Sequence, residues 1–485
     1  MSIARALTNA VSGLTANARG TETVAANLAN VMTPGYGRRE VALTAQTLGG
    51  NTGGVRIDGI SRIVNASLVA ESRLALSARS EAATRLDFLT RMGETVGLPG
   101  EAGSLGSALT EFETALQAAA TRPDDDLRLG AVVDAASRLA GRLNAASQSV
   151  QDARSAADQA IASDVAALNA SLERVAYLNR RISIIESEGS DPSSLVDERQ
   201  TVIDRIAQIV PVQEVARDSG KVALFTAEGA VLLDGSLPTR FGFAAVGQMT
   251  PDMAAGTPPV MRLVQNGQEL TASQMRLFGG GSLAGNVAIR DELGPQLQHE
   301  LDALALDLHD RLADPAVDPT MTAADPGLFT DAGSRADAAN AVGLASRLRV
   351  NTLVVPGAAG DLWRIRDGLG AAAAGQVGDA TMLLSLASAI GSARPATPGS
   401  GFEGSGSLQS RFASIEARVT SRRVSAEGES AIRNSRAETI TAKLTADGVD
   451  SDAEMQRLLQ YEQAYAANAR VIQAIDEMMD NILRL

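Results

Sequence analysis

The feature that most constrains the fold is an apolar repeat in residues 451–485, at the C-terminal end of the chain. Two sets of side chains recur every seven residues and are offset from each other by three, which is the spacing of a coiled-coil seam. Neither Pro nor Gly interrupts the stretch. The pattern predicts one long helix that packs against another, because each buried Leu or Ile contributes about 1.5–3 kcal/mol. The first set is Leu458, Tyr465, Ile472 and Met479, and the second is Tyr461, Asn468, Ile475 and Ile482.

The residues Ser451-Asp452-Ala453-Glu454 predict where this helix begins. They fit the capping box S-x-x-E, in which the serine oxygen and the glutamate carboxylate accept hydrogen bonds from backbone amides at a helix start. We therefore expect Ser451 to cap the helix and the Glu454 side chain to bond back to the Ser451 amide.

A weaker repeat at the N-terminal end predicts the partner of this helix. Residues 3–31 carry two sets at the same spacing, with smaller and more polar side chains, and Thr33-Pro34-Gly35 ends the pattern because the residue before Pro avoids the α region. The two helices would be about 43 and 50 Å long. We predict that they pair, antiparallel if both leave the same end of the body; separate docking on the body is the alternative. The sets are Ile3, Ala10, Asn17, Val24 and Val31, and Leu7, Leu14, Thr21 and Leu28.

The middle of the chain predicts a helical body interrupted by one β-rich segment. Residues 41–59 favour an extended loop or short hairpin, and residues 211–280 combine prolines, glycines and short alternating runs that indicate strands and turns. Helical patterns resume after residue 283 and include 336–348 and 409–444. The proline-free stretch 127–191 contains a further coiled-coil-like seam with one polar member that can fix register: Ile161, Val165, Leu168, Leu172, Val175, Asn179 and Ile182.

These patterns predict a mainly α fold with a β-rich insert. Both chain ends would form a terminal coiled-coil domain, from residues 1–36 and 449–485. A body of long helices would comprise residues 37–210 and 281–448, and a small outward-facing β domain would comprise residues 211–280. Such an order is the simplest explanation for helical segments on both sides of a β insert.

The sequence contains no signature of an enzyme, a metal site or a cofactor site. The only two histidines, His299 and His309, are ten residues apart, which does not match the metal-binding spacing of H-E-x-x-H, and the chain has no cysteine. The glycines at 279–281 lack the G-K-[ST] ending of a phosphate loop, and the acidic run 124–126 favours a helix start over a cation site. The sequence does not exclude a Ser-His-Asp catalytic triad, although no G-x-S-x-G motif occurs.

Charge and hydropathy narrow the class of partner. The net charge of −14 argues against binding to nucleic acid or to an anionic membrane. The sequence contains no run of about 18 apolar residues, which is the length that a membrane-spanning helix needs. The first residues lack the pattern of a cleaved secretory signal, so we expect any export to use another route.

Several motifs carry a family resemblance. The N-terminal ones are Val11-Ser12-Gly13-Leu14, Ala26-Asn27-Leu28-Ala29-Asn30 and Thr33-Pro34-Gly35-Tyr36, and the C-terminal ones are residues 448–454 and 458–472. They resemble the two ends of bacterial flagellar axial proteins. Tyr36-Gly37-Arg38-Arg39 is closer to the hook-associated members than to rod or hook subunits. Leu195-Val196-Asp197-Glu198-Arg199 and Ile289-Arg290-Asp291 resemble internal segments of the same family, whereas the segment after His309 departs from it.

The resemblance implies a structural subunit of the zone that joins the flagellar hook to the filament, with its terminal helices lining an inner tube. It also implies export through the flagellar type III apparatus, with a chaperone bound at the C-terminal helix. The partners would be further copies of this chain, the hook subunit, a second junction protein and the filament. The assembly residues implied at the N-terminal end are Leu7, Leu14, Asn27, Leu28, Asn30, Pro34, Gly35 and Tyr36. At the C-terminal end they are the eight seam residues given above.

Two other functions stay open at this stage. A hook or distal-rod subunit would share the terminal helices but not the long helical body from Leu127 to Ile209. An exported effector or cell-wall hydrolase with an axial tail would need a catalytic cluster in the β insert. We also expect both ends to be largely disordered in the monomer and to become ordered on assembly, because helices this weakly apolar depend on packing.

Overall fold

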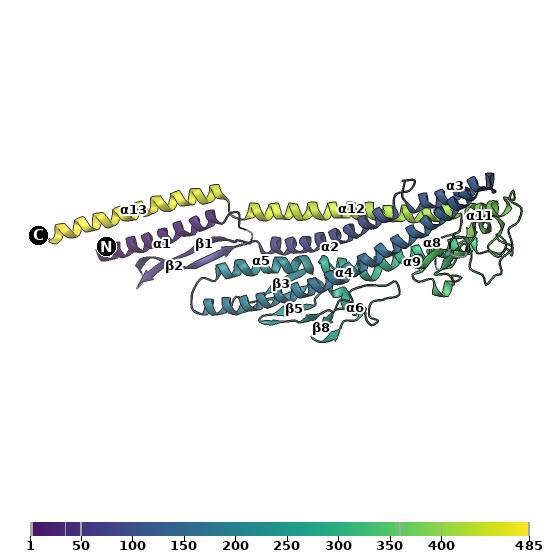
Figure 1. Ribbon diagram of the computed structural model, residues 1–485. Helices are drawn as coiled ribbons and strands as arrows, with labels where there is room; N and C mark the ends of the chain where they lie inside the picture. The colour runs from purple at the N-terminus through teal and green to yellow at the C-terminus, as the bar shows by residue number, and fades with distance from the viewer. Residues whose placement is uncertain (1–2, 34, 49–50, 358–359, 399, 484–485) are drawn as a thin grey trace.

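The computed structural model describes residues 3–33, 35–48, 51–357, 360–398 and 400–483. The molecule is elongated, and both ends of the chain lie at the same end of it (Figure 1). There α1 (Ile3–Ala29) packs along α13 (Ser451–Leu483), and the two helices run in opposite directions. The mainly α fold with a β-rich insert is therefore confirmed, and the antiparallel pairing of the terminal helices is what the structure shows.

A long β-hairpin covers another face of α1. It consists of β1 (Arg38–Leu48) and β2 (Asn51–Ile63), which pair antiparallel with Arg38 opposite Ile63. The hairpin is therefore longer than the sequence predicted. The Ser12 hydroxyl on α1 accepts a hydrogen bond from the backbone N–H of Val55 at 3.2 Å. A boundary after residue 36 would divide this hairpin from the helix on which it packs. The division into three domains stays a prediction.

The start of α13 corrects the predicted cap. Asp450, and not Ser451, provides the capping oxygen, and its Oδ1 accepts hydrogen bonds from the amides of Asp452 at 2.9 Å and Ala453 at 3.2 Å. The Glu454 side chain bonds to Asn27, Arg38 and Arg457 instead of the Ser451 amide. The capping box was a wrong prediction because tertiary partners hold this carboxylate.

The body is built on long helices, several of which share one large apolar core. Buried side chains from several of them meet there, including Phe88, Phe112, Leu139 and Phe412. The acidic run caps α4, since Asp125 Oδ1 accepts the Leu127 amide at 3.0 Å, which confirms the interpretation as a helix start. The helices are α2 (Ala66–Val96), α3 (Leu105–Thr121), α4 (Asp126–Ser187), α5 (Ser193–Ile209), α7 (Gly281–Ala288), α8 (Gly294–Leu312) and α12 (Leu408–Asp447).

The β insert packs its sheet directly on α4 and α5. Buried residues of α4, such as Leu168 and Leu172, share a core with Leu224 and Leu232 of the sheet. Figure 1 shows the insert along one side of the body. The four-stranded antiparallel sheet contains β3 (Val212–Ala216), β4 (Val222–Thr226), β5 (Val231–Asp234) and β6 (Leu237–Pro238). A three-stranded sheet contains β7 (Phe241–Gly242), β8 (Val264–Gln265) and β9 (Gln268–Glu269), followed by α6 (Ala272–Met275) and η1 (Arg276–Phe278).

The polar member of the α4 seam, Asn179, bonds to the insert and not to a partner helix. It is fully buried, and its Nδ2 donates to the carbonyls of Val222 at 2.8 Å and Gly235 at 2.5 Å. The guanidinium of Arg199 donates to Asn179 Oδ1 at 2.9 Å and to the Gly220 carbonyl at 2.6 Å. Asn179 therefore fixes the position of the sheet on α4, because each of these groups would be costly to bury without a partner.

The other internal motif, Ile289-Arg290-Asp291, bonds to α4. The guanidinium of Arg290 donates to Asp158 Oδ1 on α4 at 2.9 Å, and both side chains are about 1% exposed. It also pairs with Asp291 at 2.6 Å. Arg290 lies in a π-helical turn, η2 (Ile289–Leu293), between α7 and α8. The motif thus orients two helices through a buried, fully paired cation.

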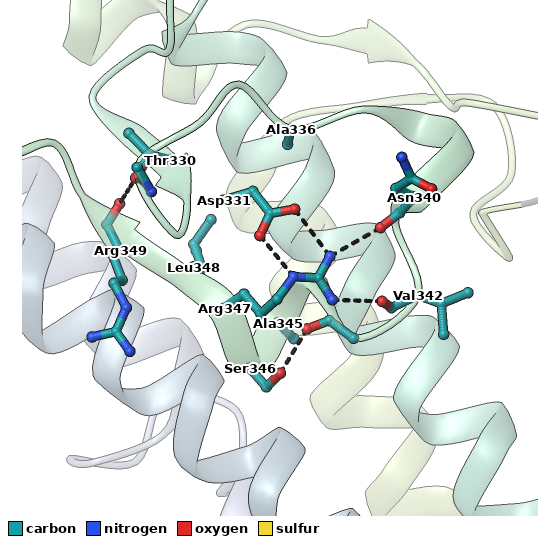
Figure 2. Close-up of polar contacts among 12 residues, drawn as sticks. Thr330, Asp331, Ala336, Asn340, Val342, Ala345, Ser346, Arg347, Leu348 and Arg349 are labelled. Carbon is teal, nitrogen blue, oxygen red and sulfur yellow. Dashed lines mark hydrogen bonds and ion pairs between the residues drawn. The ribbon is translucent and has the colours of Figure 1, made fainter. Parts of the chain in front are cut away.

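The segment after α8 departs most from the sequence prediction. Residues 336–348 do not form one helix, because the guanidinium of Arg347 folds the segment back on itself (Figure 2). It pairs with both oxygens of Asp331, at 2.7 and 3.0 Å, and donates to the carbonyls of Asn340 at 3.0 Å and Val342 at 2.8 Å. The elements here are β10 (Phe329–Asp331), η3 (Ala338–Asn340), α9 (Leu344–Arg347), β11 (Leu348–Val350), η4 (Thr352–Val354), α10 (Trp363–Asp367), α11 (Thr381–Gly391), β12 (Arg394–Pro395) and β13 (Ser405–Gly406).

Candidate assembly site

The candidate site is the joint where the terminal helix pair meets the body. The loop between α1 and β1 lies there, together with the first turn of α13, the base of the hairpin and the start of α5. We call the hydrogen-bonded group formed by Asn27, Tyr36, Arg39, Asp197 and Glu454 the joint clasp. Its members come from three separate stretches of the chain, which are residues 27–39, α5 and α13.

Asn27 at the end of α1 is the centre of the clasp. It is fully buried, and all of its side-chain hydrogen-bonding atoms have partners. Its Oδ1 accepts from the Tyr36 hydroxyl and from the Arg39 amide, each at 2.9 Å. Its Nδ2 donates to the Arg39 carbonyl and to Glu454 Oε2, each at 2.9 Å. One side chain therefore holds the loop after α1 and reaches the other end of the chain.

Glu454 anchors the first turn of α13 to this centre. Its side chain is about 1% exposed. Besides the bond from Asn27, its Oε1 accepts from Arg457 at 2.8 Å and from Arg38 at 3.4 Å. A buried carboxylate is stable only with such donors, because removing its partners would leave an uncompensated charge. The register of α13 on α1 is thus set by a directional polar contact.

Asp197 connects the clasp to the body. Its Oδ1 accepts from the Gly37 amide at 3.1 Å and from Arg62 Nε at 2.7 Å, and its Oδ2 accepts from Arg39 Nη2 at 3.0 Å. The Arg39 guanidinium also stacks 5.0 Å from the centre of the Tyr36 ring. Burial raises the pKa of the Tyr36 hydroxyl, so that hydroxyl remains a donor to Asn27. One carboxylate of α5 therefore holds the loop and the hairpin base together.

Beyond the clasp, the two helices approach closely where α1 has glycine. A Cβ atom on Gly20 would lie 2.5 Å from the Tyr461 ring, and one on Gly13 would lie 2.8 Å from Asn468 Nδ2. Such distances are too short for real side chains, so a larger residue at either position would force the Tyr461 or Asn468 side chain to shift. These two glycines of α1, which lie outside the predicted sets, are therefore complementary to Tyr461 and Asn468 of α13.

The structure brings some of the sequence-predicted residues together and leaves others at the surface. Ile475 is buried against α1, whereas Tyr465, Met479 and Ile482 are about half exposed in the single chain, so the expectation that they lie in this seam is not met. Pro34 lies outside the described residues. Half-buried positions are Leu7, Leu14, Leu28, Asn30, Gly35 and Tyr36 on the N-terminal side, and Leu458, Tyr461, Asn468 and Ile472 on the C-terminal side. Their part in assembly stays a prediction.

Sequence reasoning named Asn27 and Tyr36 but missed Asp197 and Glu454 as members of the site. Glu454 precedes Tyr461 by seven residues, so it belongs to the set that continues through Asn468 and Ile475 to face α1. That spacing was a usable signal. The role of Asp197 was not accessible in this way, because its partners Arg39 and Arg62 are more than 130 residues away in the chain.

The two histidines differ in their surroundings. His309 is buried, its Nε2 accepts the Ala336 amide at 3.2 Å, and its Nδ1 therefore donates to the Phe329 carbonyl at 2.8 Å. Burial lowers the pKa of His309, which keeps the ring neutral. His299 is exposed. Among the described residues no group of His, Asp or Glu is arranged to hold a metal ion, and no helix is long and apolar enough to cross a membrane.

Three family models match the chain, one after another. They are Flagella basal body rod protein over residues 7–36, Flagellar hook-associated protein FlgK helical domain over residues 94–314, and Flagellar basal body rod FlgEFG protein C-terminal over residues 443–485. The first and last models cover α1, the loop after it and α13. The middle model covers α3 to α8 with the β insert.

Curated proteins with flagellar names are similar to part of the chain. Flagellar hook-associated protein 1 of Salmonella typhimurium is 28% identical over 309 residues, covering 62% of this chain and 54% of that protein. The proteins of the same name from Escherichia coli and Bacillus subtilis are 26% and 27% identical, covering 55% and 46% of their lengths. The chain spans about half the length of these relatives. The flagellar hook junction protein FlgK from Burkholderia pseudomallei matches with a TM-score of 0.46 at 22% identity, over 54% of this chain and 46% of that one.

The order of the three matches also agrees with the joint clasp. Asn27 and Tyr36 lie in the first match, Asp197 in the second and Glu454 in the third. With rod-type matches at both ends and a match to the FlgK helical domain between them, the chain is similar to flagellar axial proteins, and in its middle part to hook-associated protein 1.

Proposed function

We propose that this chain is a structural subunit of the bacterial flagellum that forms the zone between hook and filament by assembling through its terminal helices. The observation that carries the proposal is the hydrogen bond between Asn27 and Glu454, which joins α1 to the first turn of α13. This bond presents α1 and α13 as one unit at the end of an elongated body. One face of α13 packs on α1, and its other faces expose apolar side chains that further subunits would cover.

The helical body supports a junction subunit over a hook or rod subunit. Rod-type matches at the two ends are shared by all axial subunits, whereas the FlgK helical domain matches residues 94–314. That interval includes the 62-residue α4 and the adjacent α5, which the hook and rod alternative does not require. The effector or hydrolase alternative would need a catalytic cluster in the insert, and the buried polar residues found there hold the sheet in place.

The proposed partners follow from this location. They are neighbouring copies of the chain, the hook subunit, a second junction protein and the filament, all outside the cell. The exported chain would pass through the flagellar type III apparatus, with a chaperone covering the exposed apolar face of α13. The role is non-catalytic and needs no cofactor, nucleic acid or membrane.

The terminal pair supports ordering on assembly. Ile475 is the fully buried apolar side chain of α13 in the part of the chain that the structure describes, and the buried apolar residues of α1 are the small Ala10, Ala16 and Val24. Each contributes at most about 1.5–3 kcal/mol, which barely offsets the cost of ordering two long helices. Neighbouring subunits would supply the missing burial, so in the free monomer the pair would open readily.

A strain that lacks the gene tests the proposal. We expect electron microscopy to show hooks without filaments, and we expect flagellin in the culture medium. The wild-type gene should restore filaments, whereas Ile475→Asp should not, although its body remains folded by circular dichroism. Loss of the hooks as well would favour the rod or hook alternative. Normal filaments in the deletion strain would contradict a structural role.

A further inference from the structure

The two halves of α12 are held on the protein in different ways. We call residues 408–423 the anchored half and residues 424–447 the strap. The apolar side chains that the strap buries are Ala437 and Ile440, which lie in a small separate cluster. The anchored half buries a longer series in the large core of the body, namely Leu408, Phe412, Ile415 and Val419. Because most helical stability in proteins comes from such packing, the strap is held far less firmly.

The strap packs on α2 (Figure 1). The anchored half ends with a polar contact to the body core, in which Arg422 pairs with the buried Glu300 of α8 at 2.9 Å. Among the residues that the structure describes, the polar side-chain contact between the strap and another helix is the ion pair of Arg436 with Glu71 of α2, at 3.2 Å. These two side chains are 58% and 49% exposed, and ion pairs at such exposure contribute little stability. Polar contacts therefore do not replace the burial that the strap lacks.

A cleft of about 350 Å³ separates α2 from α12 where the anchored half meets the strap. Small side chains on both helices leave this space unfilled: Ala78 and Ala82 of α2, and Ser425 and Ala426 of α12. The facing surfaces of the two helices do not bury each other here, so they gain little from the removal of apolar area from water. The contact between α2 and α12 is therefore weakened at the point where the strap begins.

The sequence of the strap forms a helix only weakly on its own. Gly428 lies in its interior, where glycine is less favourable than alanine by a factor of about five. Serine or threonine occupies six positions of the strap. The hydroxyls of Thr439, Thr441 and Thr445 donate to carbonyls four residues earlier, an arrangement that slightly destabilises a helix. A helix of this composition is marginal in water once its packing is lost.

We propose that the strap is a detachable part of the body: in the free chain it separates from α2 and loses its helix, while the anchored half stays in place. This inference rests on the proposed function and deepens it, because the strap leads directly into α13. The C-terminal segment that becomes ordered on assembly then begins near residue 424, in the middle of α12, and not at the end of that helix. A released strap lets α13 move relative to the body until strap and α13 become ordered together.

Hydrogen exchange of the full-length monomer, followed by mass spectrometry, tests the proposal. We expect amides of the strap to exchange roughly a hundredfold faster than those of the anchored half. Gly428→Ala should slow exchange in the strap about fivefold, since a Cβ atom there meets nothing within 4 Å. Gly141→Ala, at an equally open position of α4, is the matched control and should leave the strap unchanged. Equal exchange in the two halves of wild-type α12 would overturn the proposal.

Thiol labelling provides a second readout, because the chain contains no cysteine. Ala437→Cys places a thiol on the buried face of the strap, and Ala176→Cys places one in α4; both alanines are 2% exposed. With a maleimide, we expect the thiol at 437 to react roughly a hundredfold faster than the thiol at 176. Circular dichroism checks that both variants fold, and the wild-type exchange data show whether the strap opens without the new side chain. Equal labelling rates would contradict the proposal. If both tests fail while the wild-type gene still restores filaments, the strap is fixed and the proposed function stands.

Discussion

The terminal helix pair and the helical body are stabilised in different ways. In the body, α12 buries Leu408, Phe412, Ile415 and Val419 in a large core shared with α3, α4 and α8. In the terminal pair, the tightest contacts are polar and directional, and they centre on Asn27 and Glu454. The body thus has the burial that an independent fold requires, whereas the pair has a precise register but little burial. A region of this kind is suited to being completed by neighbours.

The largest effect is expected from the body core. Phe112 is fully buried and makes an edge-to-face contact with Phe329, with ring centroids 5.8 Å apart. Phe112→Ala should lower the free energy of unfolding by about 3–5 kcal/mol. Thermal denaturation followed by circular dichroism measures the loss. Leu127→Ala, at an 86% exposed side chain, serves as the control and should change stability little. Equal effects of the two changes would contradict the division into a stable body and weak ends.

A slightly smaller effect, confined to the ends, is expected from the joint clasp. Glu454→Ala leaves the Asn27 amide and the Arg38 guanidinium without this partner, at a cost of about 3 kcal/mol. Hydrogen exchange should become faster in α1 and α13 while protection in α4 is unchanged. Glu454→Gln keeps an acceptor for Asn27 and should have a weaker effect. Faster exchange throughout the body would show that the clasp stabilises the whole molecule instead.

A third comparison concerns the close approach of the helices. Gly20→Ala favours the helix by about 1 kcal/mol, but its Cβ would overlap the Tyr461 ring, and overpacking costs about 1–3 kcal/mol. We expect the terminal pair to be weakened, with faster hydrogen exchange in α13. Adding Tyr461→Ala should restore protection, because the double variant removes the overlap. If Gly20→Ala alone increases protection, the ring moves aside and the fit at this point is not tight.

The sequence predictions succeeded where regular spacing sets a helix face and failed where distant residues make polar contacts. The seven-residue repeats of α1 and α13 predicted a pair, because regular spacing alone determines which helix face is apolar. Asp197 was missed as a member of the clasp because it reaches Arg39 and Arg62 across the fold, and no local pattern reports a contact between residues so far apart. The same reason explains the error at residues 336–348. There, the pairing of Arg347 with Asp331 overrides a helical pattern.

The smallest effect is a pH dependence within the body, where two adjacent residues of α8 act in opposite directions. Burial raises the pKa of Asp310 to about 6, so its contribution to stability is present below the unfolded pKa near 3.8 and is lost as pH rises through about 6. Burial lowers the pKa of His309, so its contribution is present above about 6.5 and is lost as pH falls.

Asp310→Asn separates the two contributions. At pH 7 it should stabilise the protein by about 1–2 kcal/mol, a value reduced for solvent screening because the carboxylate is only partly buried. The gain should shrink to a few tenths of a kcal/mol near pH 4, where the carboxyl group is protonated in the folded state and about half protonated in the unfolded state. Urea denaturation at both pH values measures it, with Asp134→Asn, at an exposed aspartate of α4, as the control. A gain that persists unchanged at pH 4 would mean that packing, and not the buried charge, is the cause. Because neither residue touches the terminal pair, exchange rates in α13 should be the same in the variant and the wild type.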